Sequence, residues 1–207
     1  MSDTRSQFIA AGLKLYPQYG YQKLSVRVLS AEAGLSAGMF HHLFEDKDAF
    51  IAEVLASQHE RTFGRLQLDK VEGVDAFERL QRTLRLVALC LRDNLHWVQR
   101  TFADSGEGVE VVAQFWREHF GIQTQRLLAL LAQCEDTEPS VQMHRLAYLS
   151  ASVTGPMVIG TRLNDMGMLP QALSGHIADI LEDTAIFQRI NWALAALFPN
   201  QTIISLP

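Results

Sequence analysis

The sequence predicts an all-α protein of about nine helices: a small N-terminal three-helix domain, then a larger helical domain. Apolar residues recur at helical spacing along all 207 residues, and no stretch alternates apolar and polar residues as a half-buried strand does. A hydrophobic content of 48% with only six Pro and 13 Gly supports a sizeable core and argues against a disordered chain. Capping side chains and glycines divide the helical pattern into segments.

Residues 25–47, SVRVLSAEAGLSAGMFHHLFEDK, predict two short helices, over 26–33 and 37–43, and the start of a long one. Each is preceded by a side chain whose oxygen can accept a bond from a free backbone N–H, and a glycine able to adopt the left-handed conformation ends the first. The three caps and this glycine are Ser25, Ser36, Asp46 and Gly34. Two short helices joined by such a turn form a helix-turn-helix, whose second helix can enter the major groove of DNA.

The apolar positions of this segment support the same geometry. The residues expected to face inward, where the helices and the turn meet, are Leu29, Ala33, Leu35, Phe40 and Leu43. The second-helix residues expected to point outward are Ala37, Gly38, Met39, His41 and His42. An outward face this poor in charge is unusual for a solvated helix and suits a surface pressed against a partner.

The segment resembles the DNA-binding region of the TetR family of bacterial transcriptional regulators. That family reads roughly A-G-[VL]-S-x-G-x-[LF]-Y-x-[HYL]-F-x-[SD]-K, and residues 33–47 read AGLSAGMFHHLFEDK. The likeness covers about residues 5–55, with further agreement at FIAAGL (8–13), YGY (19–21) and SV (25–26). His41 replaces the family's usual Tyr, Ala37 a frequent basic residue and Met39 a Ser or Thr. These departures bear on the DNA sequence recognised rather than on the fold.

The resemblance implies a homodimer that places both second helices in successive major grooves of a near-palindromic operator. Half-sites then lie about one helical turn, ~34–36 Å, or more apart. We expect phosphate contacts from Ser25, Lys47 and His42, thymine-methyl contacts from Ala37 and Met39, a guanine N7 contact from His41 and close backbone approach at Gly38. Arg27 is expected at a phosphate or a base edge. The predicted DNA-binding set is Ser25, Arg27, Ser36, Ala37, Gly38, Met39, His41, His42 and Lys47.

The charge of the head keeps an alternative open. Residues 1–60 hold five Lys/Arg and seven Asp/Glu, a net charge of −2, and the whole chain has a net charge of −5. DNA-binding proteins usually carry a basic face, so this head depends on helix N-termini and on a few cations, namely Arg5, Lys23, Arg27 and Lys47. The alternative is a helical interaction protein with a degraded DNA-binding head. A mobility shift with the upstream intergenic DNA separates the two.

The remaining helices follow from apolar stripes and breaks. The first helix is expected to bury Phe8, Ala11, Leu15 and Tyr19 and to stop at Gly20. Later helices are expected at about 77–91, 97–102, 112–134, 140–164 and 174–198. The predicted domains are 1–48 for DNA binding and 49–207 for ligand binding and dimerisation, linked by the long fourth helix.

Aromatic residues gather in the sixth and seventh predicted helices and can be core or pocket. The resemblance favours a pocket, because TetR-like regulators bind a small, usually hydrophobic or aromatic molecule among their middle helices. We therefore expect a small apolar effector between the fifth and eighth helices. The predicted ligand-binding set is Trp97, Phe102, Phe115, Trp116, His119, Met157 and Arg162, although the methionine can also be a gap filler and the arginine a surface residue.

The last two predicted helices are expected to form a homodimer interface. The run SASVTGP at 150–156 has small side chains that allow close approach, and Pro156 should kink its helix. In the resembling family the last two helices form a four-helix dimer bundle. The predicted interface set is Ser152, Gly155, Ile177, Ile180, Leu181, Thr184 and Phe187.

The sequence argues against an enzyme and against a membrane or secreted protein. It contains no metalloprotease, nucleophile-elbow, phosphate-loop or dinucleotide motif, and we expect no cofactor and no metal. No apolar run reaches ~18 residues, the start has no signal-peptide pattern, and Cys90 and Cys134 are not paired by motif. We therefore predict a cytoplasmic regulator, most simply a repressor released by its effector, with an activator left open.

Overall fold

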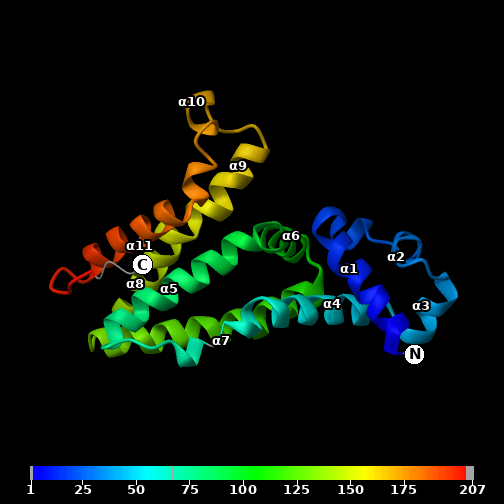
Figure 1. Cartoon of the computed structure of the whole chain (residues 1–207), viewed down its shortest axis with the longest axis horizontal. Helices are drawn as coiled ribbons and strands as arrows, with labels where there is room; N and C mark the ends of the chain where they lie inside the picture. The colour runs from blue at the N-terminus through cyan, green and yellow to red at the C-terminus, as the bar shows by residue number, and fades with distance from the viewer. Residues whose placement is uncertain (1, 67, 204–207) are drawn as a thin grey trace. The chain divides into compact units, whose positions relative to one another are not determined.

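The computed structural model describes residues 2–66 and 68–203, and these form eleven α-helices and no strand, which confirms the predicted all-α class (Figure 1). The first helices are α1 (Ser2–Lys23), α2 (Val26–Ala33), α3 (Ala37–Leu43), α4 (Lys47–Arg61), α5 (Ala76–Asp93) and α6 (Leu95–Gly106). The later ones are α7 (Glu110–Cys134), α8 (Pro139–Val153), α9 (Thr161–Asp165), α10 (Gln171–Ser174) and α11 (Asp183–Leu197). No helix within this described part is both long and apolar enough to span a bilayer.

The helices pack into two compact units. Residues up to 65 together with 96–121 form one, here called the head unit, and residues 66–95 together with 122 onward form the other, here called the C-terminal unit. These packing units differ from the predicted division after residue 48, because the apolar face of α4 belongs to the core of the head. The functional division at that residue stays a prediction.

The head unit is built on an aromatic core between α1, α3 and α4. Phe40 lies edge-on to Phe8 and Phe50, with ring centroids 5.5 and 5.2 Å apart. Gly12 of α1 allows α4 to approach closely, since a Cβ there would lie 2.5 Å from Val54 Cγ2. Tyr16 is fully buried, whereas Tyr19 is 39% exposed, so the prediction that Tyr19 lies on the inner stripe of α1 was wrong.

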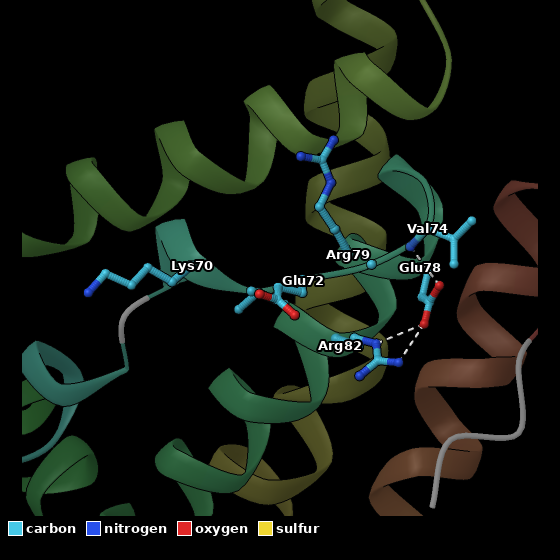
Figure 2. A pocket seen from close by; sticks show the side chains of 8 residues that line it. Lys70, Glu72, Val74, Glu78, Arg79 and Arg82 are labelled. Atoms are coloured by element: carbon cyan, nitrogen blue, oxygen red, sulfur yellow. Dashed lines mark hydrogen bonds and ion pairs between the residues drawn. The ribbon is translucent and has the colours of Figure 1, made fainter.

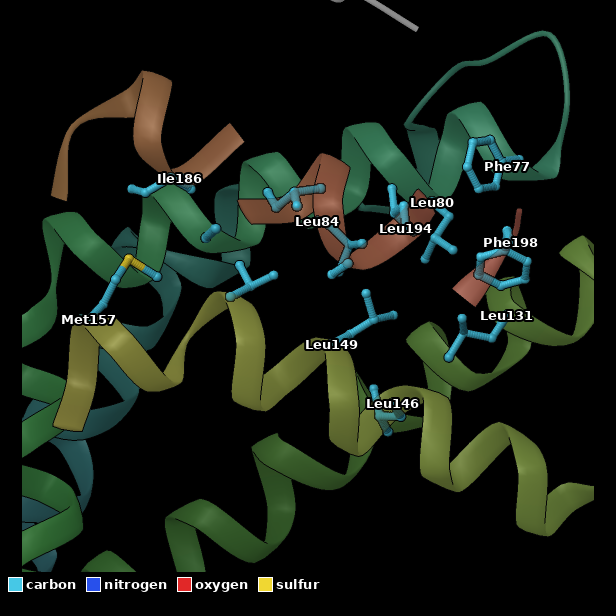
Figure 3. Close-up of a cluster of buried hydrophobic side chains, with 14 of the residues drawn as sticks. Phe77, Leu80, Leu84, Leu131, Leu146, Leu149, Met157, Ile186, Leu194 and Phe198 are labelled. Atoms are coloured by element: carbon cyan, nitrogen blue, oxygen red, sulfur yellow. The ribbon is translucent and has the colours of Figure 1, made fainter. Parts of the chain in front are cut away.

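The C-terminal unit has a core of its own. Helices α5 and α8 both pack against α11, and Figure 3 shows their apolar side chains meeting between the ribbons. The side chains of this core include Leu80, Leu84, Leu131, Leu149, Ile186, Ile190 and Leu194. Phe77 and Phe198 close one end in an edge-on pair 5.6 Å apart.

Two predicted helices near the C-terminus were wrong in extent. The expected helix over 140–164 ends at Val153, continues through a π-helical turn at Pro156–Gly160 and resumes as α9. Proline has no N–H to donate and its ring crowds the preceding turn, which accounts for the widened backbone. The expected helix over 174–198 begins only at Asp183, because Glu182 is extended (φ −66°, ψ 145°). The predicted stripe of Ile177 to Phe187 is therefore spread over turns, a 3₁₀ segment and α11.

Candidate nucleic-acid interface

The helix-turn-helix forms through local caps at the predicted positions. Ser25 Oγ accepts from the N–H of Val28 at 3.3 Å, and Ser36 Oγ accepts from that of Met39 at 3.4 Å. Gly34 has the left-handed backbone (φ 67°) that ends α2. Three local signals thus set the start and end of α2 and the start of α3, and the structure confirms both helices as predicted. A fourth, Asp46, caps α4 by accepting from Ala49 N at 2.7 Å.

The face of α3 away from the core is exposed and carries no acidic or permanently basic side chain. Phe40 is 1% exposed and holds α3 against the aromatic core. The exposed residues are Ala37, Gly38, Met39, His41 and His42, and the exposed fraction of Met39 is 44%. These side chains are exposed, so the face is open to a partner surface.

Cations flank this face unequally. Arg27 and Lys23 are exposed near α2, whereas Lys47 is half-buried at the start of α4, with Nζ 4.1 Å from the centre of the Tyr21 ring. Partial burial lowers the pKa of Lys47, and the charges of Asp48 and Asp104 oppose that shift.

Arg5 was expected among the cations available to DNA, but its side chain is engaged within the head unit. It forms an ion pair with Glu53, donates to the Leu43 carbonyl at 2.7 Å and lies over the Phe44 ring. It ties α1 to α3 and α4 and is not held toward the exposed face.

Comparison with known proteins accounts for this geometry. The family model described as bacterial regulatory proteins, tetR family, matches residues 8–54, which contain all of α2 and α3. Residues 8–54 therefore form a tetR-type DNA-binding region. The uncharacterized helix-turn-helix-type transcriptional regulator YuxN of Bacillus subtilis (strain 168) is 32% identical over 73 residues. That match covers 35% of this chain and 25% of YuxN, so the chain spans about a quarter of that relative's length.

Solved structures of other regulators share the fold of this chain. The flavonoid-responsive regulator FrrA has a TM-score of 0.62 at 19% identity, covering 96% of this chain and 97% of FrrA. FadR from Bacillus subtilis, solved in complex with stearoyl-CoA, has a TM-score of 0.56 at 16% identity, covering 85% of this chain and 96% of FadR. FrrA is described as a regulator and FadR as a transcriptional regulator.

The predicted ligand-binding residues divide between the two units. Five lie in the head unit, where Phe102 stacks on Trp116 (4.3 Å between centroids) and Phe115 stacks on His119 (4.4 Å). Trp97, the fifth, stacks on Tyr16 inside the head. The other two, Met157 and Arg162, lie in the C-terminal unit, the first buried and the second exposed. The set therefore stays a prediction.

A cleft of about 860 Å³ lies elsewhere, at the start of α5, and contains none of the predicted site residues (Figure 2). Its charged side chains are largely engaged with one another or with neighbours. Glu78 accepts from Val74 N and Arg82 Nε, each at 2.9 Å, and these bonds lower the pKa of Glu78. Arg79 donates to Gln133 of α7 at 2.8 Å. This polar cleft is a poor match for an apolar effector.

Sequence reasoning did not assign a role to three residues that the structure places in notable contacts. These are Tyr21 under Lys47, Asp104 beneath the end of α1, and His59 of α4. The rings of His59 and His119 lie 4.1 Å apart. Asp104 carried one usable signal, since it follows Leu95, Val98 and Thr101 at a spacing of three residues and so shares the face of α6 that is buried. Within the described residues no group of three or more His, Cys, Asp or Glu side chains is arranged to hold a metal ion.

The His59 environment predicts a pH effect on stability. Burial, and then the neighbouring His119, lower the pKa of His59, while Glu60 opposes the shift. The unfolded chain therefore binds a proton more readily than the folded one, and stability should fall as the pH drops through about 6.5. We expect thermal denaturation to show a lower Tm at about pH 5.5 than at about pH 7.5. His59→Gln should make the dependence of Tm on pH weaker, whereas His96→Gln, a change at an exposed position, should leave it unaltered. An equal dependence of Tm on pH in the wild type and both variants would contradict the role given to His59.

Proposed function

We propose that this TetR-family regulator binds a near-palindromic operator as a homodimer and is a repressor released by a small, largely apolar effector. One observation carries the DNA-binding part: α3 is capped, anchored from one side by Phe40, and exposes an uncharged face of small and imidazole side chains. Such a face can lie close to base edges, because it brings no carboxylate into the groove. The base-edge and phosphate roles predicted for Ser25 to Lys47 are part of this proposal.

A homodimer is supported by the outward faces of α8 and α11, which pack side by side in the C-terminal unit. Tyr148 of α8 is 45% exposed and Trp192 of α11 is 63% exposed. The charged side chains between 140–153 and 184–197 are Arg145 and Arg189, and both bind within the chain, to Glu135 and to the Ile180 carbonyl. A broad two-helix surface without free charge is characteristic of an interface with a second copy.

Not all predicted interface residues suit that surface equally. Thr184 is exposed on the outward side of α11. Leu181 and Phe187 pack against the unit's own core, and Arg85 lies over the Phe187 ring. We therefore centre the proposed interface on Tyr148, Thr184 and Trp192.

An apolar effector is supported by the aromatic residues of α6 and α7. Phe102 and Phe120 are 47% and 59% exposed, and Phe102 stacks on Trp116 almost in parallel (interplanar angle 7°). A stacked aromatic surface suits planar or apolar molecules. A flavonoid and stearoyl-CoA, the compounds named with FrrA and FadR, are rational first probes in a thermal-shift assay. An effector can release DNA only if it binds the two states of the protein with different affinity.

The DNA-binding proposal is tested by Lys47→Ala and the salt dependence of operator binding. Each lost phosphate contact should make the slope of log K against log[salt] shallower by about 0.9, or about 1.8 for a dimer. Lys14→Ala is the matched control, because it removes the same charge from an exposed head lysine that pairs with Glu32. Fluorescence anisotropy measures the operator affinity of both variants over a series of salt concentrations. A Lys47→Ala slope equal to that of the control would remove Lys47 from the contacts.

The alternative, a helical interaction protein, is favoured by the charge of the head. Of the five Lys/Arg within residues 1–60, Arg5 and Lys14 are engaged with Glu53 and Glu32. This alternative predicts no mobility shift with the upstream intergenic DNA at any tested salt concentration.

A further inference from the structure

A buried carboxylate on α6 holds the end of α1. Asp104 is 1% exposed, and its Oδ2 accepts from the Tyr16 hydroxyl at 2.6 Å and from the Tyr21 backbone N–H at 2.8 Å. Its Oδ1 faces Arg100 Nη1 at 3.4 Å. Burial, and then the bond to Asp104, raise the pKa of Tyr16, so the phenol stays protonated and donates.

The backbone around this carboxylate is shaped to reach it. Gly20 adopts φ 67° and ψ 176°, which turns the chain so that the next N–H points at Asp104. A Cβ at Gly20 would lie 2.6 Å from Arg100 Nη1 and 2.9 Å from Asp104 Oδ1. A charge buried in this way costs free energy unless several donors satisfy it, and removal of the carboxylate would leave Tyr16 and Tyr21 without their acceptor.

The residue held by Asp104 in turn supports Lys47. The Lys47 ammonium lies 4.1 Å from the centre of the Tyr21 ring, a cation–π distance. The Tyr21 hydroxyl donates to Asp48, and this bond raises the pKa of Tyr21 to about 12. The backbone of Tyr21 is thus fixed from α6, while its side chain engages the first two residues of α4.

We infer that Asp104 is a positioning residue for DNA binding: through the Tyr21 N–H it fixes the ring that presents Lys47 to a DNA phosphate. This inference rests on the proposed function, because it assigns Lys47 a phosphate contact. It links an element outside the helix-turn-helix, α6, to the cation at the start of α4 through two interactions, a hydrogen bond and a cation–π contact. A merely structural Asp104 would stabilise the head without changing what Lys47 contributes.

The test combines a measurement on the free protein with a double-mutant cycle. In the DNA-free protein, ring currents of Tyr21 should shift the Lys47 side-chain NMR signals upfield, and the signals are assigned by their loss in Lys47→Ala. We expect Asp104→Ala to abolish this shift. Asp104→Asn should retain it, since its amide oxygen can still accept from Tyr16 and Tyr21. An unchanged shift in Asp104→Ala would overturn the inference.

Operator affinity provides the second part of the test. A lost charge-assisted contact corresponds to about a tenfold drop in affinity, which we expect for Lys47→Ala in the wild-type background. In the Asp104→Ala background the same substitution should have less than about a twofold effect, because Lys47 is already misplaced. Equal effects in both backgrounds would show that Asp104 and Lys47 act independently and would overturn the inference.

Two further variants keep the test decisive. If Asp104→Ala does not fold, Tyr16→Phe replaces it, because this variant removes one donor to Asp104 and keeps the ring stacked on Trp97. It should move the Lys47 signals part of the way in the same direction. Unmoved signals would contradict the positioning role of Asp104. Tyr21→Leu should abolish the upfield shift, whereas Tyr21→Phe should keep it. Because the NMR measurement needs no DNA, failure of the link to Lys47 is distinguishable from failure of DNA binding.

Discussion

Trp192→Arg is expected to convert the proposed dimer into a monomer and to lower operator affinity at least about a hundredfold. Trp192 is 63% exposed on the uncharged outward face of α11. In the proposed interface an arginine would lose its hydration without gaining a partner, which costs several kcal/mol by order of magnitude. A monomer engages one half-site only, so it loses the second set of contacts, and two linked sites typically exceed one by about 10²–10⁴ in affinity.

Sedimentation and fluorescence anisotropy measure the two consequences together. Trp192→Phe keeps an apolar ring at the same position and should remain a dimer with near-normal operator affinity. Thr184 is also exposed on the outward side of α11, so Thr184→Arg should act like Trp192→Arg. If Trp192→Arg sediments as a dimer of normal stability, the interface lies elsewhere and the assignment of α8 and α11 is wrong.

Phe40→Ala is expected to unfold the head and thereby to abolish DNA binding. Phe40 is 1% exposed and contacts the rings of Phe8, Phe44 and Phe50. Truncation of a buried Phe to Ala costs about 3–5 kcal/mol, a large share of the about 5–15 kcal/mol that stabilises a typical domain. The lost rings are also those that fix the orientation of α3.

Met39→Ala is the matched control for this prediction. It changes the neighbouring residue on the same helix, but the Met39 side chain is 44% exposed and points away from the core. We expect a change within about 0.5 kcal/mol in the free energy of unfolding, with an altered preference among operator sequences. Urea denaturation measures the free energy of unfolding of both variants. Equal destabilisation by Phe40→Ala and Met39→Ala would mean that the aromatic cluster does not hold the head together.

Sequence-based prediction succeeded where structure depends on residues close together in the chain and failed where it depends on distant ones. The bounds of α2 and α3 were predictable because each depends on a residue within three or four positions: the caps Ser25 and Ser36, and the left-handed Gly34. The outward face of α3 followed from the same periodicity. Beyond residue 150 the apolar periodicity continued through Pro156 and Glu182, and the predicted helices ran on where the backbone turns.

Contacts between distant segments could not be read from the sequence. Asp104 and Tyr16 are 88 residues apart, and the pair became visible only when α6 packed under α1. Arg5 was predicted as a free cation for the same reason, since its partner Glu53 lies 48 residues away. Aromatic spacing predicted Phe102 and Trp116 as pocket residues, and a cluster of methionines predicted Met157, but periodicity cannot tell which unit each one joins.

The central claim is that the exposed face of α3 reads a specific DNA sequence, and in vitro selection from a random duplex library tests it most directly. The wild-type protein is used to retain bound duplexes, which are amplified and sequenced over several rounds. We predict enrichment of one motif made of two inverted half-sites whose centres lie about one helical turn, ~10 base pairs, or more apart. Sequences that remain as diverse as the starting library would contradict the claim.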